Sequence, residues 1–237
     1  MRDTPPAANR LGWRLAFGAA WLIAAAWLFG AIAEDVVTSD RLTTVDADLA
    51  LWLHGHARPG LTAAMLAISQ LHSTVAITLY ATVLGIGCLV RRRWREFVAV
   101  VVCIGGGMVV NVLMKLAFHR ARPVFDHPLL TLSSYSFPSG HVAASTLLYG
   151  LGVTWVFAAT PARRWRVLAV VVAFVAIVLV ATSRMVLGVH YLSDVAAAFA
   201  EGVAWLAICL TALSAFWREP TAVPVAVPAA GPERGVD

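Results

Sequence analysis

Long apolar stretches, separated by short polar connections, make up most of this chain. Each approaches the length of about 20 residues that a helix needs to cross a bilayer. The stretch 61–90 is too long for one simple crossing, and polar residues at 69–74 divide it. We therefore expect a short interfacial helix at 61–68 before the second span. The pattern predicts an all-α bundle of six transmembrane helices, at 13–33, 73–90, 97–118, 141–160, 167–187 and 195–217.

Composition supports a polytopic membrane protein. Hydrophobic residues make up 60% of the 237 residues and charged residues only 13%, whereas soluble domains carry about 25% charged residues. The net charge of +5 comes from arginines in short clusters between apolar segments, which argues against a nucleic-acid partner. The three cysteines lie inside apolar segments without metal or haem spacing, so no disulfide framework is expected.

The arginine clusters orient the predicted bundle. The connection 91–96 holds four arginines and one glutamate, and 161–166 holds three arginines, so each has a net charge of +3. The loop 34–60 holds five acidic residues and two arginines, a net charge of −3. Positive loops stay in the cytoplasm. We therefore expect both termini in the cytoplasm and the loop 34–60 outside, in a bacterial inner (plasma) membrane.

The two ends of the chain fall outside the apolar region. Residues 1–12 are expected to form a cytoplasmic N-terminus, and residues 218–237, with four prolines, a disordered cytoplasmic tail. The residues between them, 13–217, would form the membrane domain. The first apolar segment also has the features of a signal peptide, and cleavage is the alternative. Cleavage would leave the orientation of the other five spans unchanged.

The first of three polar groups contains Lys115, the only lysine of the chain, and Arg122. Seven residues make nearly two helical turns, so both cations are predicted on one face, with Pro123 ending the helix. Asn111, one turn before Lys115, is placed to hold it. A charge at membrane depth is costly and usually functional. The alternative is that both cations only reach out to lipid headgroups.

The second group, Pro138–His141, opens the fourth span. Ser139 is a favoured helix N-cap, and Gly140 allows a ligand to approach the backbone closely. The free N–H groups of a helix N-terminus suit an anion. His141 would face that anion from the first turn. Ordinary helix capping beside a spectator histidine is the alternative.

The third group contains Arg184, His190 and Asp194. His190 and Asp194 are four residues apart, which predicts one face of the sixth span. A carboxylate there fixes the imidazole tautomer and leaves the other nitrogen as a nucleophile. Arg184 falls on a different face, so it reaches the same ligand only if the helix breaks, for which Gly188 is the candidate. A structural Arg–Asp pair with a buried histidine is the alternative.

With six spans, all three polar groups fall on the outer side of the membrane. Together they supply three cations, two histidines and a carboxylate, a set suited to breaking a phosphate ester. No carboxylate cluster suited to magnesium is visible in the sequence, so we expect no metal and no cofactor.

The three groups together resemble the signature of the type 2 phosphatidic acid phosphatase (PAP2) superfamily. K-x6-RP matches Lys115–Pro123, PSGH matches Pro138–His141, and SR-x5-H-x3-D matches Ser183–Asp194. The resemblance implies that His190 forms a phosphohistidine, that Asp194 orients it, and that His141 protonates the leaving oxygen and then activates water. The phosphoryl oxygens would be held by Lys115, Arg122, Ser139, Gly140 and Arg184.

Three residues are of secondary interest. Arg120 is expected to add to the phosphate site, although its spacing to Lys115 is poorer. Asn111 would support Lys115. Glu201 lies two turns after Asp194 on the same face, and would support the His190–Asp194 pair or line a groove for the lipid tail. A hydrogen-bonded buried acid without a role in the site is the alternative.

The implied function is a metal-independent membrane phosphatase acting on a lipid phosphate or diphosphate from the outer leaflet. Candidate substrates are a polyprenyl diphosphate such as undecaprenyl diphosphate, phosphatidylglycerol phosphate and phosphatidic acid. Two alternatives stay open. One is a lipid phosphotransferase using the same intermediate, and the other is a non-catalytic lipid transporter or binder. No particular oligomeric state is predicted.

Overall fold

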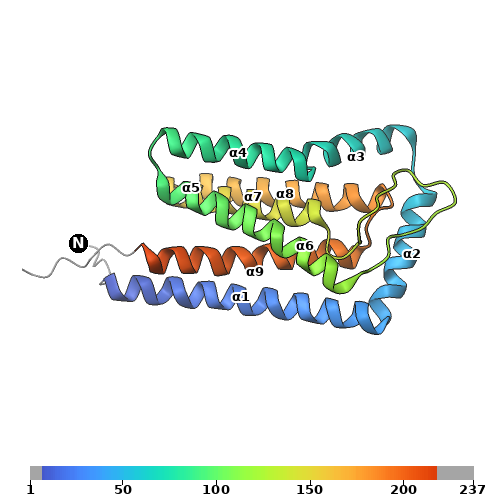
Figure 1. The fold of residues 1–237 in the computed structure, drawn as a ribbon, viewed down its shortest axis with the longest axis horizontal. Coiled ribbons are helices and arrows are strands. Elements are labelled where there is room, and N and C mark those ends of the chain that lie inside the picture. The colour runs from blue at the N-terminus through green and yellow to red at the C-terminus, as the bar shows by residue number, and fades with distance from the viewer. Residues whose placement is uncertain (1–6, 218–237) are drawn as a thin grey trace, which may run out of the picture.

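Six long apolar helical stretches run side by side and form a bundle (Figure 1). This computed structural model describes residues 7–217, so the predicted tail 218–237 and residues 1–6 lie outside it. Within the described range the chain is helical, without strands. The six predicted spans and the all-α class are thereby confirmed. The bundle helices are α1 (Ala7–Thr38), α3 (Pro59–Leu71) followed by α4 (Thr74–Val90), α5 (Trp94–Val100) continuing through a π-helical turn (Val101–Gly106) into α6 (Gly107–Phe118), α7 (Gly140–Ala159), α8 (Arg163–Val186) and α9 (Leu192–Phe216).

The segment 34–60, predicted as a loop, is mostly helical. Its helix α2 (Arg41–Gly55) begins after Asp40, whose carboxylate accepts a hydrogen bond from the Arg41 N–H (2.8 Å). α2 runs across one end of the bundle (Figure 1). Its buried residues, Asp46 and Ala50, are one turn apart and so share a face. The loop prediction was wrong because acidic residues indicate the side of the membrane, whereas they leave the secondary structure undetermined.

The separate helix predicted before the second span is present as α3, which is longer than the expected 61–68. α3 lies in line with α4 (Figure 1), and together they form one apolar stretch of 32 residues. The helix that lies across the bundle end is therefore α2 rather than α3. Pro59 at the start of α3 suits a first helical turn, where its missing N–H is not needed.

Small residues bring α7 and α9 into close contact. A Cβ on Gly202 of α9 would lie only 2.7 Å from the Thr146 side chain of α7, and the neighbouring alanines 197, 198 and 200 are buried. Such close backbone approach is typical of helix packing in membranes, where small residues replace the hydrophobic driving force. The contact joins the second turn of α7 to the third turn of α9.

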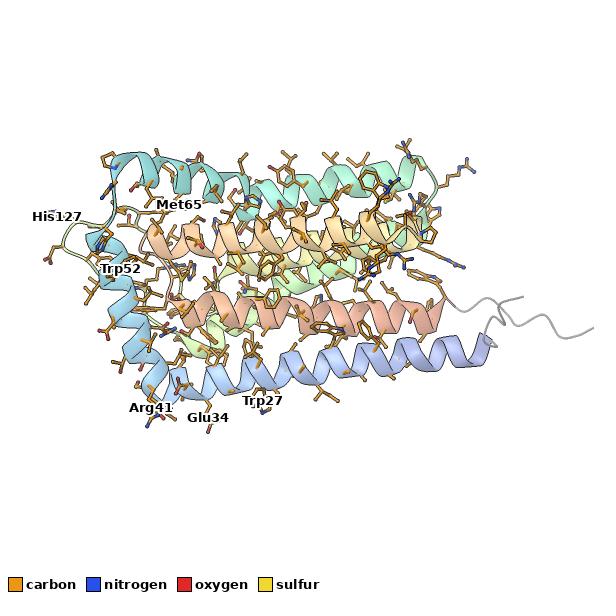
Figure 2. All side chains as sticks on the ribbon, turned by 180° about the vertical axis from the view of Figure 1, so that it is seen from behind. Trp27, Glu34, Arg41, Trp52, Met65 and His127 are labelled. Carbon is orange, nitrogen blue, oxygen red and sulfur yellow. The ribbon has the colours of Figure 1, made fainter. Side chains whose placement is uncertain are left out.

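The two ends of the bundle carry different residues. The arginine-bearing connection after α4 lies at the end where α1 begins, and α2 lies at the opposite end with the connection between α6 and α7 (Figure 1). Figure 2 shows Trp52 on α2 and His127 at the tip of the α6–α7 connection, both at this second end. The end of α6, the start of α7 and the connection between α8 and α9, which carry the three polar groups of the sequence, lie at this end too.

Candidate active site

The three polar groups of the sequence meet beneath α2. They come from the end of α6 and the loop after it, from the start of α7, and from the connection between α8 and α9. Three contacts join the groups in pairs: Lys115 Nζ with the Pro138 carbonyl oxygen (2.6 Å), the Ser139 N–H with the Asp194 carbonyl oxygen (3.0 Å), and Arg122 Nη1 with His190 Nε2 (3.2 Å).

His190 lies in the connection between α8 and α9, where it is 2% exposed. The predicted break at Gly188 is confirmed: α8 ends at Val186, and Gly188 has a left-handed φ of +69° that favours glycine. The predicted position of His190 on the sixth span is wrong, because α9 begins two residues later, at Leu192. The turn at Gly188 brings His190 back over the first turn of α9, where Asp194 lies.

The two ring nitrogens of His190 have different partners. Nδ1 lies 3.3 Å from Asp194 Oδ2 and 3.4 Å from Ser136 Oγ, whereas Nε2 faces the guanidinium of Arg122. An arginine only donates hydrogen bonds, so Nε2 must be the acceptor and Nδ1 carries the proton. The lone pair of Nε2 is therefore directed into the site. Burial lowers the pKa of His190 to about 4, although the Asp194 carboxylate opposes the shift.

Asp194 is fully buried and saturated with donors. Oδ2 accepts hydrogen bonds from the Ser136 hydroxyl and from the Tyr191 N–H (2.9 Å), besides facing His190. Oδ1 accepts a hydrogen bond from Arg120 Nη1 (2.7 Å). This set of donors holds the carboxylate in one orientation, with one oxygen directed at the imidazole.

Arg120 contacts carboxylates rather than the centre of the site. Its second nitrogen, Nη2, donates to Asp46 of α2 (2.8 Å), while Nη1 pairs with Asp194. Burial disfavours the charged guanidinium, and the two carboxylates outweigh that effect and raise the pKa of Arg120. The sequence placed Arg120 beside the phosphate; the structure places it between two acids.

Arg184 is the most completely buried cation of the site, with 1% of its surface exposed. Nη1 donates to the Ser69 hydroxyl of α3. Nε and Nη2 have no partner among the described residues, and the buried hydroxyl of Ser139 has none either. Buried donors are almost always paired, so a group of unpaired donors indicates a place for an acceptor that the protein itself does not supply.

Lys115 and Arg122 are held by the loop that follows α6. The prediction that one helical face carries both is wrong, because α6 ends at Phe118 and His119 turns the chain with a φ of 47°. Lys115 Nζ donates to the carbonyl oxygens of Tyr135 (2.8 Å) and Pro138 (2.6 Å). Backbone oxygens of the loop, including that of Tyr135 (3.1 Å), also accept hydrogen bonds from Arg122. The loop therefore brings both cations to the site without helical periodicity.

The sequence predicted that Asn111 holds Lys115, but in the structure Asn111 binds a different residue. Its side-chain N–H group donates to Glu201 Oε2 of α9 (2.9 Å), and the second oxygen of Glu201 is buried without a partner in the described part of the chain. The side-chain amide oxygen of Asn111 lies 3.2 Å from the point where a Cβ on residue 140 would stand, a position that Gly140 leaves open. Asn111 thus packs under the start of α7, and Glu201 contacts the site through it rather than through His190 or Asp194.

The start of α7 provides the remaining groups. Ser139 occupies the N-cap position, and its hydroxyl makes no capping bond to the helix. His141 lies in the first turn, half-buried, and makes no hydrogen bond to other described residues. A side chain left without a partner beside a free helix N-terminus is available to a ligand.

A cavity of about 380 Å³ lies beside this cluster. It is lined by the α6–α7 loop, including Arg122 and Tyr135, and by Gly188 and Val189. Between residues 7 and 217 no three His, Cys, Asp or Glu side chains are grouped so as to hold a metal ion. The charges around the buried imidazole are instead those of Arg122, Arg184 and Asp194.

Two known proteins are similar to this chain in sequence. The chain is 29% identical over 147 residues to phosphatidylglycerophosphatase B of Bacillus subtilis, a match that covers 62% of this chain and 72% of the relative. It is 34% identical over 157 residues to decaprenylphosphoryl-5-phosphoribose phosphatase of Mycobacterium tuberculosis, covering 61% of this chain and 76% of the relative.

Solved structures show the same fold. A transmembrane PAP2 type phosphatidylglycerolphosphate phosphatase from Bacillus subtilis superposes with a TM-score of 0.73 at 25% identity, covering 83% of this chain and 97% of the other. Aquifex aeolicus LpxE superposes with a TM-score of 0.55 at 19% identity, covering 70% and 94%, and shows the fold alone. The PAP2 superfamily model matches residues 96–218, more than half of the chain. This integral membrane protein therefore belongs to the PAP2 superfamily, among the membrane lipid phosphatases.

Proposed function

We propose that this protein hydrolyses a lipid phosphate or diphosphate at the outer face of a bacterial inner membrane, through a phosphohistidine on His190. The supporting observation is a buried arginine, Arg184, two of whose donor nitrogens have no partner among residues 7–217, at the same end of the bundle as the buried imidazole of His190. A buried cation without a counter-ion is costly. A bound phosphoryl group would supply the missing acceptors and place a phosphorus atom near Nε2.

The reaction follows from the positions of the two histidines. In the first step the Nε2 lone pair of His190 attacks phosphorus, the P–O bond to the leaving group breaks, and the leaving oxygen takes a proton from His141. In the second step water attacks phosphorus and gives its proton to His141, the P–N bond breaks, and phosphate leaves. Asp194 accepts the hydrogen bond from Nδ1 and stabilises the positive charge of the phosphohistidine.

Charge compensation would come from the cations and the start of α7. Phosphoryl transfer depends mainly on positioning and on stabilising the charge of the equatorial oxygens. Lys115, Arg122 and Arg184 would contact these oxygens, and Ser139 and the Gly140 N–H would add neutral donors. When the phosphoryl group binds, Arg122 would release His190 Nε2 and donate its hydrogen bond to a phosphoryl oxygen instead. With three cations in these positions, we propose that the reaction needs no metal ion.

The position of the site suits a lipid substrate. It lies at one end of the bundle, where a head group reaches water while its tail stays in the bilayer, and the cavity beside Arg122 offers room for that head group. The arginine-rich connections lie at the other end, which the positive-inside rule assigns to the cytoplasm together with both termini. We propose residues 13–217 as the catalytic unit. The names of the relatives favour phosphatidylglycerol phosphate or a polyprenyl-linked phosphate over phosphatidic acid.

A panel of lipid phosphates tests this function. We expect the purified protein in detergent to release inorganic phosphate from phosphatidylglycerol phosphate or a polyprenyl diphosphate, in the presence of a chelator. Product analysis with added glycerol separates hydrolysis from phosphotransfer, because a transferase would form glycerol phosphate. Folded protein that releases phosphate from none of the lipids, or that binds them without turnover, would refute the proposal in favour of a transporter or binder.

The pH dependence of kcat/KM should show a low acid limb. His190 attacks only as the neutral imidazole, and burial lowers its pKa to about 4, against the pull of Asp194 and with the help of Arg122 and Arg184. Because neutral imidazole predominates above the pKa, activity should be retained on acidification until the pH approaches about 4. Two substrates whose phosphate groups titrate at different pH identify the limb that belongs to the enzyme. An enzyme limb near 6.5 would mean that His190 is solvated.

A further inference from the structure

A carboxylate from outside the signature motifs reaches the site from α2. Asp46 is 1% exposed, and it precedes Ser193 by 147 residues and the family match by 50 residues. It accepts hydrogen bonds from the Ser193 N–H (2.9 Å), from the Ser193 hydroxyl and from Arg120 Nη2 (2.8 Å). All of these donors lie next to the nucleophile and its carboxylate, so Asp46 is built into the site rather than left on the surface of α2.

Arg120 connects Asp46 to the nucleophile. Its Nη2 binds Asp46 Oδ2 (2.8 Å), while Nη1 binds Asp194 Oδ1 (2.7 Å) and the Ser193 hydroxyl (2.6 Å). The guanidinium is planar, so fixing both terminal nitrogens fixes the whole group. Asp194 in turn presents its other oxygen to His190 Nδ1. The contacts form one chain from α2 to the imidazole.

Asp46 also sets the charge around Asp194. Asp46, Arg120 and Asp194 together carry one net negative charge at neutral pH, because two carboxylates share one guanidinium. Without the Asp46 carboxylate, Arg120 would form an ion pair with Asp194 alone, and the charges of that pair would cancel. A neutral group stabilises less well the positive imidazole ring that forms when phosphorus binds Nε2.

We propose that Asp46 is a positioning residue for the phosphatase reaction. It holds Arg120 so that Asp194 keeps one oxygen on His190 and retains negative charge for the phosphohistidine. The inference rests on the proposed function. It makes α2, which lies outside the matched family region, a part of the site, since the helix that crosses the bundle end supplies the last carboxylate of the chain of contacts.

The Asp46→Asn variant tests the proposal, with Asp48→Asn as the matched control. Asp48 lies two residues further along α2 and is exposed. We expect Asp46→Asn to lower kcat about 10- to 100-fold with little change in KM, the usual effect of removing a group that orients an active-site residue. Asp48→Asn should leave both constants unchanged. A kcat for Asp46→Asn equal to that of wild type, in an active preparation, overturns the inference while leaving the proposed function intact.

The pH profile separates positioning from a merely structural role. The groups whose charges act on His190 are Asp194, Arg122, Arg184 and His141, with Arg120 behind Asp194. Removing the negative charge of Asp46 makes the imidazolium less favourable, so the acid limb should move to lower pH. A structural role would lower Tm and leave the limb in place, and that result counts against the proposal.

Coupling to Arg120 gives an independent measurement. In an Arg120→Met background, the Asp46→Asn change should cost no further kcat, because the residue through which Asp46 acts is gone. Additive losses of kcat would contradict the chain of contacts.

If Asp46→Asn does not fold, Ser193→Ala decides, since it removes the hydroxyl between Asp46 and Arg120 without changing charge. It should lower kcat about 5-fold at constant KM, and an unchanged kcat would overturn the proposal.

Discussion

His190→Ala is expected to abolish phosphate release, with kcat reduced by at least about 10⁴-fold, as for other enzymes that lose a nucleophile. No other described side chain presents a lone pair in the same setting, with one nitrogen bonded to a carboxylate and the other facing a guanidinium. The cations would still bind the phosphoryl group. The variant should therefore keep affinity for a phosphate inhibitor while losing turnover, and steady-state kinetics with the best lipid substrate measure both quantities.

Trapping the intermediate completes this prediction. Wild-type protein mixed with ³²P-labelled substrate and quenched in alkali, where phosphohistidine survives, should carry label on a peptide that contains His190. His127→Ala is the matched control, because His127 is exposed and lies at the tip of the α6–α7 loop (Figure 2). It should keep both the label and the turnover. Label that persists in His190→Ala would assign the nucleophile to another residue.

The apolar pattern predicted the architecture because the bilayer imposes it. A stretch of about 20 apolar residues has few stable alternatives to a spanning helix. The same physics indicated the candidate site, since Lys115, Arg184 and Asp194 are costly at the ends of such helices unless they have a function. Their convergence at one end then followed from counting spans, and the contacts among the three polar groups show that they meet.

Helix ends were predicted less well. Lys115 and Arg122 were placed on one helix, and His190 and Asp194 on another, although in each pair one residue lies in a loop. Periodicity is informative inside a helix and says little about where it stops. At His119 the end comes from a left-handed residue that is not glycine, which carries no strong sequence signal. At Gly188 the signal was present and the turn was found.

The sequence did not predict which side chains on different helices bind each other. The sequence shows Asp46 only as one charge of the segment 34–60 and predicts Arg120 as a secondary phosphate contact, whereas in the structure the two residues, 74 apart in the chain, bind each other. Asn111 was assigned to Lys115 by helical spacing and instead pairs with Glu201, 90 residues away. Such pairs depend on which helices are neighbours, and one sequence does not specify that.

Arg184→Met is expected to lower kcat/KM by about 10² to 10³-fold, the usual effect of losing one donor to a developing negative charge, while leaving the protein at least as stable as wild type. Arg184 is 1% exposed, and two of its side-chain nitrogens lack partners in residues 7–217. Such a charge costs stability in the free enzyme, and an apolar side chain of similar length removes that cost. Among residues 7–217, the side-chain hydrogen bond that Arg184 would lose is the one to the Ser69 hydroxyl, and its loss opposes this gain.

Thermal unfolding in detergent and steady-state kinetics measure the two effects together. Adding inorganic phosphate or vanadate should raise the Tm of wild type, because an anion that binds only the folded state stabilises it, and should raise the Tm of Arg184→Met much less. Arg91→Met is the matched control, since Arg91 is exposed and follows α4 at the opposite end of the bundle. It should respond to the anion like wild type. An Arg184→Met protein that unfolds several degrees earlier while retaining kcat/KM would show that Arg184 holds α3 and α8 together rather than the phosphate. If the Tm of Arg184→Met instead equals or exceeds that of wild type while its kcat/KM falls, burial of the Arg184 charge destabilises the free protein, and binding of the phosphoryl group offsets that cost.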